Sequence, residues 1–289
     1  MTYANPAAIV STDWLAQHLT APDLRVVDAT WFHPRSGLKG RAEYDAAHIP
    51  GAIHFDIDDI ADTSRPLPHM LPDATRFASK VRKLGLGNGN RIVVYDRSGG
   101  GAAAARVWWM LRVFGHRDVS VLDGGFEAWL AEGRAQEDLP PMPRERHFMP
   151  RVNQLLVRSF EQMKTGLEQG REQIVDARSP GRFAGTEPEP WPGKKAGHMP
   201  GALNVPWTDL LDPAGKTFLP APALIARFER AGVDLARPIV TTCGSGVTAC
   251  VLALALALLG RDDVAVYDGS WAEWGQADDS VAVCAAVAE

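Results

Sequence analysis

The phrase His48-Ile49-Pro50-Gly51-Ala52 returns 150 residues later as His198-Met199-Pro200-Gly201-Ala202. Two further phrases recur in the same order, at offsets of 148 and 145 residues: Val26-Val27-Asp28-Ala29 with Ile174-Val175-Asp176-Ala177, and Val121-Leu122-Asp123-Gly124-Gly125 with Val266-Tyr267-Asp268-Gly269-Ser270. Ordered repeats at a nearly constant spacing indicate one duplicated unit. The length of 289 residues is also about twice that of an average domain. We therefore expect two similar domains.

Each unit alternates short β-branched runs with apolar helical stretches. The runs predict buried strands at 24–27, 92–95, 119–122, 173–175, 238–241 and 264–267. The stretches 102–114 and 248–259 are apolar on nearly all sides, which predicts buried helices. Strand–helix–strand alternation implies a mainly parallel sheet with helices on both faces. The predicted fold class is therefore α/β, with two such domains in tandem.

A proline-rich segment separates the two units. Four prolines, at positions 140, 141, 143 and 150, stand among charged residues. The place of this segment between the repeats favours an interdomain linker over an ordinary surface loop. We expect a first domain over 1–137, a linker over 138–150 and a second domain over 151–289.

The composition excludes several classes of protein. Hydrophobic residues make up 46% and charged residues 22% of the chain, which argues against a disordered or fibrous protein. Because 30 basic residues face 35 acidic ones, no positive surplus is available for a phosphate backbone, and we expect no nucleic-acid partner. The longest apolar run, from Ala249 to Leu259, is too short to cross a bilayer. No basic residue precedes an apolar stretch at the N-terminus, so we expect neither a membrane span nor a secretory signal.

The three cysteines, Cys243, Cys250 and Cys284, all fall in the last fifth of the chain. An odd and clustered set does not build a disulfide framework, so a cytoplasmic location is expected. Cys250 falls in an apolar helical stretch and Cys284 in an alanine-rich tail, where packing is the simpler interpretation; redox sensing by Cys250 is a minor alternative. None of the cysteines has the spacing of zinc ligands, and we expect no metal or organic cofactor.

Cys243 differs because it opens the glycine-rich loop Cys243-Gly244-Ser245-Gly246-Val247-Thr248 directly after a predicted strand. Ligands bind at this end of a strand in open α/β sheets. Two glycines let the backbone curl, and free N–H groups at the start of the next helix stabilise a thiolate or another anion. We therefore interpret Cys243 as a nucleophile, and note Asp96 at the equivalent position of the first unit. A cysteine-dependent phosphatase is disfavoured because it needs an arginine six residues after the nucleophile, where this chain has Ala249.

The sequence resembles the tandem-domain rhodanese family over essentially the whole chain, and is closer to its 3-mercaptopyruvate sulfurtransferase branch. The resemblance rests on the duplicated unit, the cysteine loop and specific phrases that include Arg106-Val107-Trp108-Trp109-Met110 and Gly185-Thr186-Glu187-Pro188-Glu189-Pro190. It implies a catalytically inactive first domain, with which Asp96 agrees. It also implies that Cys243 takes sulfur from a donor, holds it as a persulfide and passes it to an acceptor.

The resemblance assigns the other site residues. The family's Gly-Arg-Phe motif appears as Gly181-Arg182-Phe183, which implies that Arg182 binds the carboxylate of the donor. Family segments that hold an acid and a histidine match Asp58 and His69. On that basis Asp58 orients His69, and His69 manages protons together with Ser245. The persulfide would lie in a ring formed by Gly244, Gly246, Val247 and Thr248.

The loop chemistry favours 3-mercaptopyruvate as the small-molecule sulfur donor. The thiosulfate-using branch carries cationic residues after the cysteine, whereas this chain has the uncharged Gly244 and Ser245. An uncharged loop with a hydroxyl suits a 2-oxo acid, whose carbonyl needs a hydrogen-bond donor. The implied acceptor is a thiol, such as thioredoxin or dihydrolipoate, or cyanide. Two alternatives stay open: thiosulfate as the main donor, and a non-catalytic sulfur-carrier or binding module.

One residue departs from the family pattern. Many members of the branch have a second arginine after the Glu-Pro-Glu-Pro phrase, but this chain has Trp191. An indole donates one N–H and cannot pair with a carboxylate. Either Lys194 or Lys195 supplies the second cation, or Arg182 acts alone, so the affinity for the donor is in question more than the type of reaction.

Overall fold

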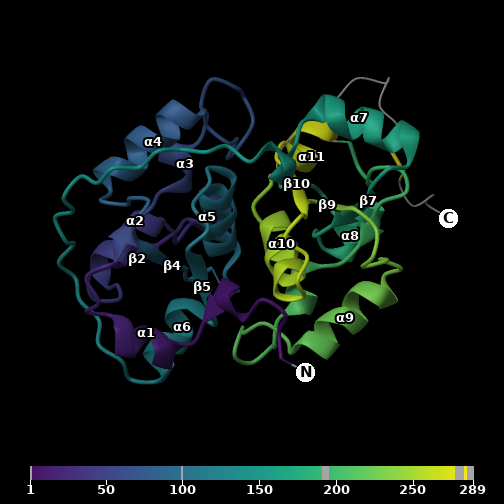
Figure 1. Cartoon of the computed structure of the whole chain (residues 1–289). Coiled ribbons are helices and arrows are strands. Elements are labelled where there is room, and N and C mark those ends of the chain that lie inside the picture. The colour runs from purple at the N-terminus through teal and green to yellow at the C-terminus, as the bar shows by residue number, and fades with distance from the viewer. Residues whose placement is uncertain (1, 99, 191–194, 277–282, 285–289) are drawn as a thin grey trace.

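The computed structural model describes residues 2–98, 100–190, 195–276 and 283–284. The chain folds into two α/β halves, each built on a five-stranded sheet (Figure 1). The strands pair in parallel, in the orders β1-β5-β4-β2-β3 and β6-β10-β9-β7-β8. Because the two orders are equivalent, the repeat in the sequence is a repeat of the fold, and the predicted fold class is confirmed.

The first half extends to α6. Its strands are β1 (Ile9–Val10), β2 (Leu24–Asp28), β3 (Ile53–His54), β4 (Arg91–Tyr95) and β5 (Val119–Leu122). Its helices are α1 (Thr12–His18), α2 (Gly40–Ala46), α3 (Ile57–Ile60), α4 (Ala74–Lys83), α5 (Ala102–Val113) and α6 (Gly125–Ala131), with short 3-10 turns at η1 (Pro6–Ala8) and η2 (Pro34–Ser36). The three strands predicted in this half are confirmed to within one residue at each end.

The second half repeats this order. Its strands are β6 (Val157–Arg158), β7 (Gln173–Asp176), β8 (Leu203–Asn204), β9 (Ile239–Thr242) and β10 (Ala265–Tyr267). Its helices are α7 (Phe160–Gln169), α8 (Pro180–Ala184), α9 (Ala221–Arg230), α10 (Ala249–Leu258) and α11 (Ser270–Trp274), with 3-10 turns at η3 (Gln154–Leu156) and η4 (Trp207–Leu210). Within the described part of the chain, no helix has the length and apolar character needed to cross a membrane.

Helices α5 and α10 pack against each other between the two sheets (Figure 1). Every residue of α10 is buried, as are eleven of the 12 residues of α5. Each helix covers its own sheet and also meets the other half, which explains why both stretches are apolar on nearly all sides. One continuous apolar core runs through both halves. The loops that precede α5 and α10 follow β4 and β9, so the ligand-binding ends of both sheets meet at this interface.

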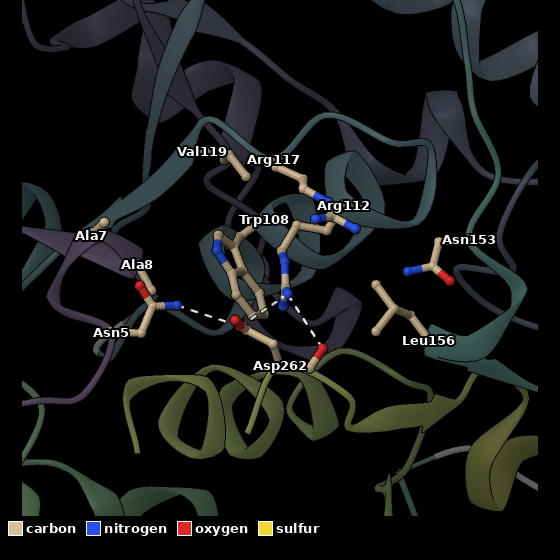
Figure 2. Close-up of a pocket in the computed structure, with 10 residues that line it drawn as sticks. All are labelled: Asn5, Ala7, Ala8, Trp108, Arg112, Arg117, Val119, Asn153, Leu156 and Asp262. Carbon is tan, nitrogen blue, oxygen red and sulfur yellow. Dashed lines mark hydrogen bonds and ion pairs between the residues drawn. The ribbon is translucent and has the colours of Figure 1, made fainter. Parts of the chain in front are cut away.

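Polar contacts close the opposite end of the interface, around a cavity of about 190 Å³ (Figure 2). Arg112, from α5, forms an ion pair with Asp262 at 3.1 Å, and its guanidinium lies 4.5 Å from the ring centroid of Trp108. Asn5 donates to the same carboxylate at 3.4 Å. These contacts join the N-terminal segment, α5 and the turn after α10.

The described chain has no helix or strand between α6 and η3, a stretch that includes the segment 138–150. This segment runs along the first half. Arg82 donates to the main-chain oxygen of Phe148 at 2.7 Å, and Asn88 donates from its main chain to His147 at 3.2 Å. Phe148 is fully buried and lies edge-on to Phe77 of α4. The segment therefore covers α4 while it leads from one half to the other.

Candidate active site

Cys243 lies between the two halves of the molecule, in a cleft of about 270 Å³. The residue is only 2% exposed, and it follows β9 as the sequence predicts. The first half contributes side chains such as Trp31, His33 and Ala102 to the walls of the cleft. Of the predicted site residues, six line it together: Arg182, Cys243, Gly244, Ser245, Val247 and Thr248.

The cysteine loop keeps its main-chain amides available. No main-chain N–H of residues 244–248 donates a hydrogen bond to another residue that the structure describes. The loop carbonyls are bound instead: the oxygen of Cys243 accepts from the main chain of Trp271 at 2.9 Å, and that of Gly244 accepts from Ala272 at 2.7 Å. The loop is thus fixed on α11, while its amides form a ring that suits a bound anion.

Two positions enforce this loop conformation. Gly246 has φ +77°, and a Cβ atom there would lie 2.6 Å from the main-chain oxygen of Asp268, so only glycine fits. Ser270 is fully buried at φ +48°, and its Oγ accepts from the N–H of Cys243 at 3.1 Å. Ser270 is not among the site residues predicted from the sequence; the signal that could have found it is its place in the repeat, opposite Gly125, which also has a positive φ.

Asp96 shows what the equivalent loop does in the first half. It follows β4 as Cys243 follows β9, and it is 2% exposed. Its carboxylate accepts from the main-chain N–H groups of Ser98 at 3.0 Å and Ala104 at 2.8 Å. Burial raises the pKa of Asp96, and these hydrogen bonds oppose that shift. The first-half loop therefore holds a carboxyl group of its own chain where the second-half loop carries a thiol.

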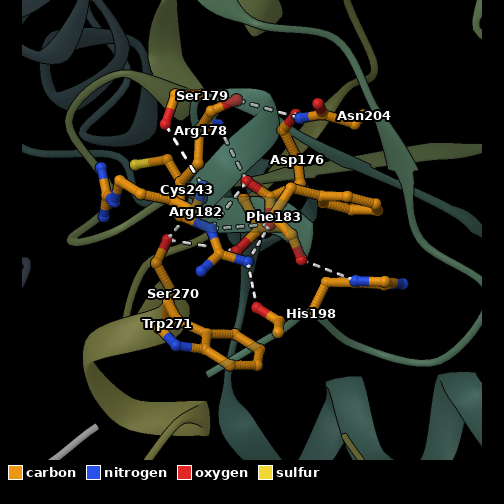
Figure 3. A network of polar contacts seen from close by, with 12 residues as sticks. Asp176, Arg178, Ser179, Arg182, Phe183, His198, Asn204, Cys243, Ser270 and Trp271 are labelled. Carbon is orange, nitrogen blue, oxygen red and sulfur yellow. Dashed lines mark hydrogen bonds and ion pairs between the residues drawn. The ribbon is translucent and has the colours of Figure 1, made fainter. Parts of the chain in front are cut away.

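Arg182 of α8 lies against the cysteine loop (Figure 3). A Cβ atom on Gly244 would lie 2.6 Å from Nη2 of Arg182. Glu189 holds the guanidinium, with Oε2 2.5 Å from Nη2 and Oε1 3.2 Å from Nε. A cation is thus positioned beside Cys243, and it shares its charge with a glutamate that is not among the predicted site residues.

Glu189 is itself held by a second, fully buried arginine. Arg178 Nη1 donates to Glu189 Oε1 at 2.8 Å, and Arg178 Nη2 donates to Asp176 Oδ2 at 2.7 Å. Burial acts to lower the pKa of Arg178, but the two carboxylates outweigh it and the pKa is raised. The guanidinium also lies 4.3 Å from the ring centroid of Trp271 (Figure 3). This charged network gives Glu189 a fixed place behind Arg182.

Asp58 and His69 form a pair, as the resemblance implies. Asp58 Oδ1 lies 2.7 Å from Nδ1 of His69, and its Oδ2 accepts from the indole N–H of Trp31 at 2.8 Å. Burial acts to raise the pKa of Asp58, but the hydrogen bond and charge of His69 outweigh it and lower the pKa. The ionised carboxylate fixes the proton of a neutral imidazole on Nδ1 and leaves Nε2 as the basic nitrogen. Trp31 packs edge-on to the imidazole and also lines the cleft.

The other two cysteines have different surroundings. Cys250 is fully buried in α10, where burial raises the pKa of its thiol to about 12. Its Sγ donates to the main-chain oxygen of Gly246 at 3.2 Å, so it packs beneath the loop as a protonated thiol. Cys284 is exposed and bonds through its main chain to His198. The expectation that Cys284 packs is therefore wrong.

The departure at Trp191 lies outside the described residues, as does Lys194. Lys195 is described, and its main chain donates to Gly275 at 2.7 Å and accepts from the indole of Trp271 at 3.0 Å. Among the described side chains, no group of histidine, cysteine and carboxylate residues is arranged to hold a metal ion.

A model of the Rhodanese-like domain matches this chain twice, over residues 11–132 and 159–277. The chain belongs to the rhodanese family. The human 3-mercaptopyruvate sulfurtransferase is 44% identical to it, over 92% of this chain and 91% of that protein. The rat thiosulfate sulfurtransferase is 45% identical, with the same coverage of the two chains. The Escherichia coli structure described as SseA, a 3-mercaptopyruvate sulfurtransferase, superposes with a TM-score of 0.84 at 38% identity, over 92% of this chain and 99% of that chain.

These likenesses confirm the family and the two-domain fold that the sequence implies. They also confirm the type of reaction: this rhodanese is a sulfurtransferase. Relatives named for two different donors are about equally similar to it. The donor therefore has to be argued from the cleft.

Proposed function

We propose that the protein transfers sulfur from 3-mercaptopyruvate to a thiol or to cyanide, with Cys243 as the sulfur carrier. The observation that carries this proposal is that three features meet in one cleft. They are a buried thiol, a loop whose main-chain N–H groups donate to no described residue, and the guanidinium of Arg182. The amides stabilise a thiolate and then a persulfide. The guanidinium matches the carboxylate of a 2-oxo acid.

In the proposed first step, the thiolate of Cys243 attacks the sulfur of 3-mercaptopyruvate. An S–S bond forms, the C–S bond of the donor breaks, and its electron pair leaves as the enolate of pyruvate. The enolate carbon takes up a proton to give pyruvate, and Cys243 keeps the transferred sulfur as a persulfide. In the second step, an acceptor thiolate or cyanide attacks the outer sulfur, and the thiolate of Cys243 leaves. No external oxidant or reductant is needed.

The protons of this reaction are assigned to His69 and Ser245. The carboxylate of Asp58 sets the tautomer in which Nε2 of His69 accepts a proton. Ser245 lines the cleft two residues after the nucleophile, and its hydroxyl can both donate and accept. In this assignment the two groups take the proton of the donor thiol and stabilise and protonate the enolate.

The charge of the cleft favours 3-mercaptopyruvate over thiosulfate. Thiosulfate is a dianion, whereas Gly244 and Ser245 carry no charge and Arg182 already shares its charge with Glu189. A donor with a single negative charge and a carbonyl group is better matched to one guanidinium and a set of hydrogen-bond donors. Relatives named thiosulfate sulfurtransferase keep thiosulfate as the second candidate.

The two halves have different roles in this proposal. Residues 1–137 form a catalytically inactive domain whose loop is closed by Asp96, residues 138–150 form the linker, and residues 151–289 form the catalytic domain. The support is the carboxyl group of Asp96 in the place of a thiol. The acceptors we expect are dithiols such as thioredoxin or dihydrolipoate, in a reducing cytoplasm. An Arabidopsis thaliana relative is named as mitochondrial, which makes mitochondria the alternative location.

The test compares the two donors at equal concentration, with cyanide and with a dithiol as acceptors. We expect a higher kcat/KM with 3-mercaptopyruvate for both acceptors, and release of one pyruvate for each sulfur transferred. Cys243→Ser removes the proposed carrier, and Cys250→Ser is the matched control. Activity that survives Cys243→Ser, or a higher kcat/KM with thiosulfate, would contradict the proposal.

A further inference from the structure

The two halves dock on each other through a pair of matching contacts. On one side, Asp268 Oδ2 accepts from the main-chain N–H of Leu71 at 2.7 Å. On the other, Asp123 Oδ1 accepts from the main-chain N–H of Phe218 at 2.9 Å. The two amides each come two residues after a residue of positive φ, namely His69 at +59° and Lys216 at +56°. The interface therefore has an approximate twofold arrangement.

A buried arginine is present on the side of Asp268. Arg106, from α5, is fully buried, and its Nη2 lies 2.7 Å from Asp268 Oδ1. The same Nη2 donates to the main-chain oxygen of His69, and Nη1 donates to the main-chain oxygen of Gly246 at 3.2 Å. Its guanidinium also lies 4.5 Å from the ring centroid of Trp109. One planar group thus joins the turn that carries His69 to the loop that carries the nucleophile.

The equivalent contact, between Asp123 and Phe218, is made without an arginine, so docking of the two halves does not require this cation. The two helices correspond at an offset of 145 residues, at which Gly101 and Gly115 match Gly246 and Gly260, so Val251 of α10 stands opposite Arg106. Asp123 makes its contact across the interface without an ion pair to any described residue, and burial raises its pKa to about 6. Burying a guanidinium is costly, and well-packed apolar side chains often stabilise such a site equally well. The burial of Arg106 is therefore not explained by docking of the two halves alone.

We propose that Arg106 is a positioning residue for sulfur transfer, which clamps the His69 turn and the cysteine loop in one relative placement. This inference rests on the proposed function of His69 and Cys243. A planar guanidinium has fixed donor directions, so it resists displacement of one carbonyl relative to the other. The proton-transfer group and the sulfur carrier come from different halves, and Arg106 contacts the main chain of both segments.

The clamp also sets the direction of a loop amide. In a trans peptide, the C=O of one residue and the N–H of the next point in opposite directions. Arg106 binds the oxygen of Gly246, so the N–H of Val247 points away from Arg106. Val247 lines the cleft, and its amide donates to no described residue. Loss of Arg106 is expected to release this peptide group and weaken the amide ring around the sulfur.

The test uses Arg106→Met and Arg106→Lys, with Asp123→Asn in the equivalent contact as the control. Arg106→Met removes the clamp, and Arg106→Lys keeps the charge but has no planar pair of donors for two carbonyls. We expect both Arg106 variants to lower kcat by about tenfold or more, with KM for 3-mercaptopyruvate within about twofold of wild type. The pH profile of kcat is also expected to change, because it reports the placement of His69. Asp123→Asn is expected to keep kcat and the pH profile, whatever its melting temperature.

An unchanged kcat and pH profile in both Arg106 variants would overturn the inference. So would an equal loss of kcat in Asp123→Asn, because Arg106 would then act only through the docking of the two halves. Where Arg106→Met does not fold, Arg106→Lys decides.

A donor-independent measurement separates this inference from the proposed function. If the wild-type protein takes up no sulfur on Cys243, the proposed function is wrong but the inference about Arg106 is not yet decided. The rate at which iodoacetamide alkylates Cys243 then tests the clamp: we expect about a fivefold decrease in the Arg106 variants and none in Asp123→Asn, because the amide ring supports the thiolate. Equal rates in all four proteins would overturn the clamp.

Discussion

Oε2 of Glu189 lies 2.5 Å from Nη2 of Arg182, so the cation assigned to the donor carboxylate is already paired in the structure. The side chain of Arg182 is 23% exposed, whereas that of Glu189 is 6% exposed and also binds Arg178. A donor can therefore share the outer part of the guanidinium while Glu189 keeps its place. This arrangement limits the positive charge beside Cys243 and suits a donor with one carboxylate.

Replacing Arg182 by alanine is expected to raise KM for 3-mercaptopyruvate by about 10- to 100-fold, because a hydrogen bond to a charged group contributes about 1.5–3 kcal/mol. We expect a smaller effect on kcat, since the guanidinium contacts the donor carboxylate and not the breaking bond. Steady-state kinetics measure both. The control is Arg171→Ala, an exposed arginine that precedes β7, at the opposite end of the parallel strands from Cys243. A KM that stays within twofold of wild type would remove Arg182 from the donor site.

Replacing Glu189 by glutamine is expected to lower KM for 3-mercaptopyruvate by about threefold, because the site gains net positive charge while an amide oxygen can still accept from an arginine. The same change is expected to improve the use of thiosulfate more strongly, since a dianion gains more from the added charge. The ratio of kcat/KM for the two donors is the measurement. A ratio that moves further toward 3-mercaptopyruvate would contradict this explanation of donor choice.

Replacing Asp58 by asparagine is expected to lower kcat by about 100-fold at neutral pH, because an amide no longer fixes the proton on Nδ1 of His69. KM is expected to change little. The matched control is Asp59→Asn, in the next residue of α3, whose carboxylate binds Lys80 at 2.6 Å. If the two variants have the same kcat, the assignment of Asp58 as the orienting acid is wrong.

Gly246 and Gly51 allow a test of the loop geometry. Both have φ near +75°, but a Cβ atom at Gly51 meets nothing within 4 Å, whereas at Gly246 it would lie 2.6 Å from the oxygen of Asp268. Gly51→Ala is expected to cost about 1–2 kcal/mol of unfolding free energy, and Gly246→Ala about 3 kcal/mol or more with loss of sulfur transfer. Urea unfolding and activity measure the two effects. Equal stability and activity in both variants would mean that the close approach is not required.

The buried carboxyl of Asp123 predicts a pH effect on stability. Burial raises its pKa from 3.8 to about 6, so between these pH values the folded protein holds a proton that the unfolded chain has lost. This contribution to stability is complete below about pH 4 and is lost as the pH rises through about 6. Relative to wild type, Asp123→Asn is expected to gain about 2 kcal/mol of unfolding free energy between pH 4 and pH 7, after allowance for partial exposure. A stability difference that is the same at both pH values would contradict the assigned shift.

Much of the fold could be predicted because the repeat and the β-branched runs are local signals. The strands β4 and β9 and the largely apolar helices after them could be predicted, and this placed Cys243 at the ligand-binding end of a strand. The family resemblance added Arg182, Asp58 and His69, whose contacts depend on pairing across the fold.

The partners of these residues could not be predicted, because their contacts depend on the packing of distant segments. Glu189 belongs to the Glu-Pro-Glu-Pro motif, but the sequence does not show that its carboxylate pairs with Arg182. Ser270 stands 27 residues from Cys243 and meets it through the packing of α11 on the loop. Arg106 gave one local signal, a charge in the middle of a predicted buried helix, and such a charge calls for a partner.

The most direct test of the central claim is the mass of Cys243-containing peptides after a brief reaction with 3-mercaptopyruvate in the absence of an acceptor. We predict one added sulfur atom on Cys243, release of an equal amount of pyruvate, and loss of that sulfur when a dithiol is added. Pyruvate release with unmodified Cys243, or added sulfur on Cys250 or Cys284 instead, would contradict the account.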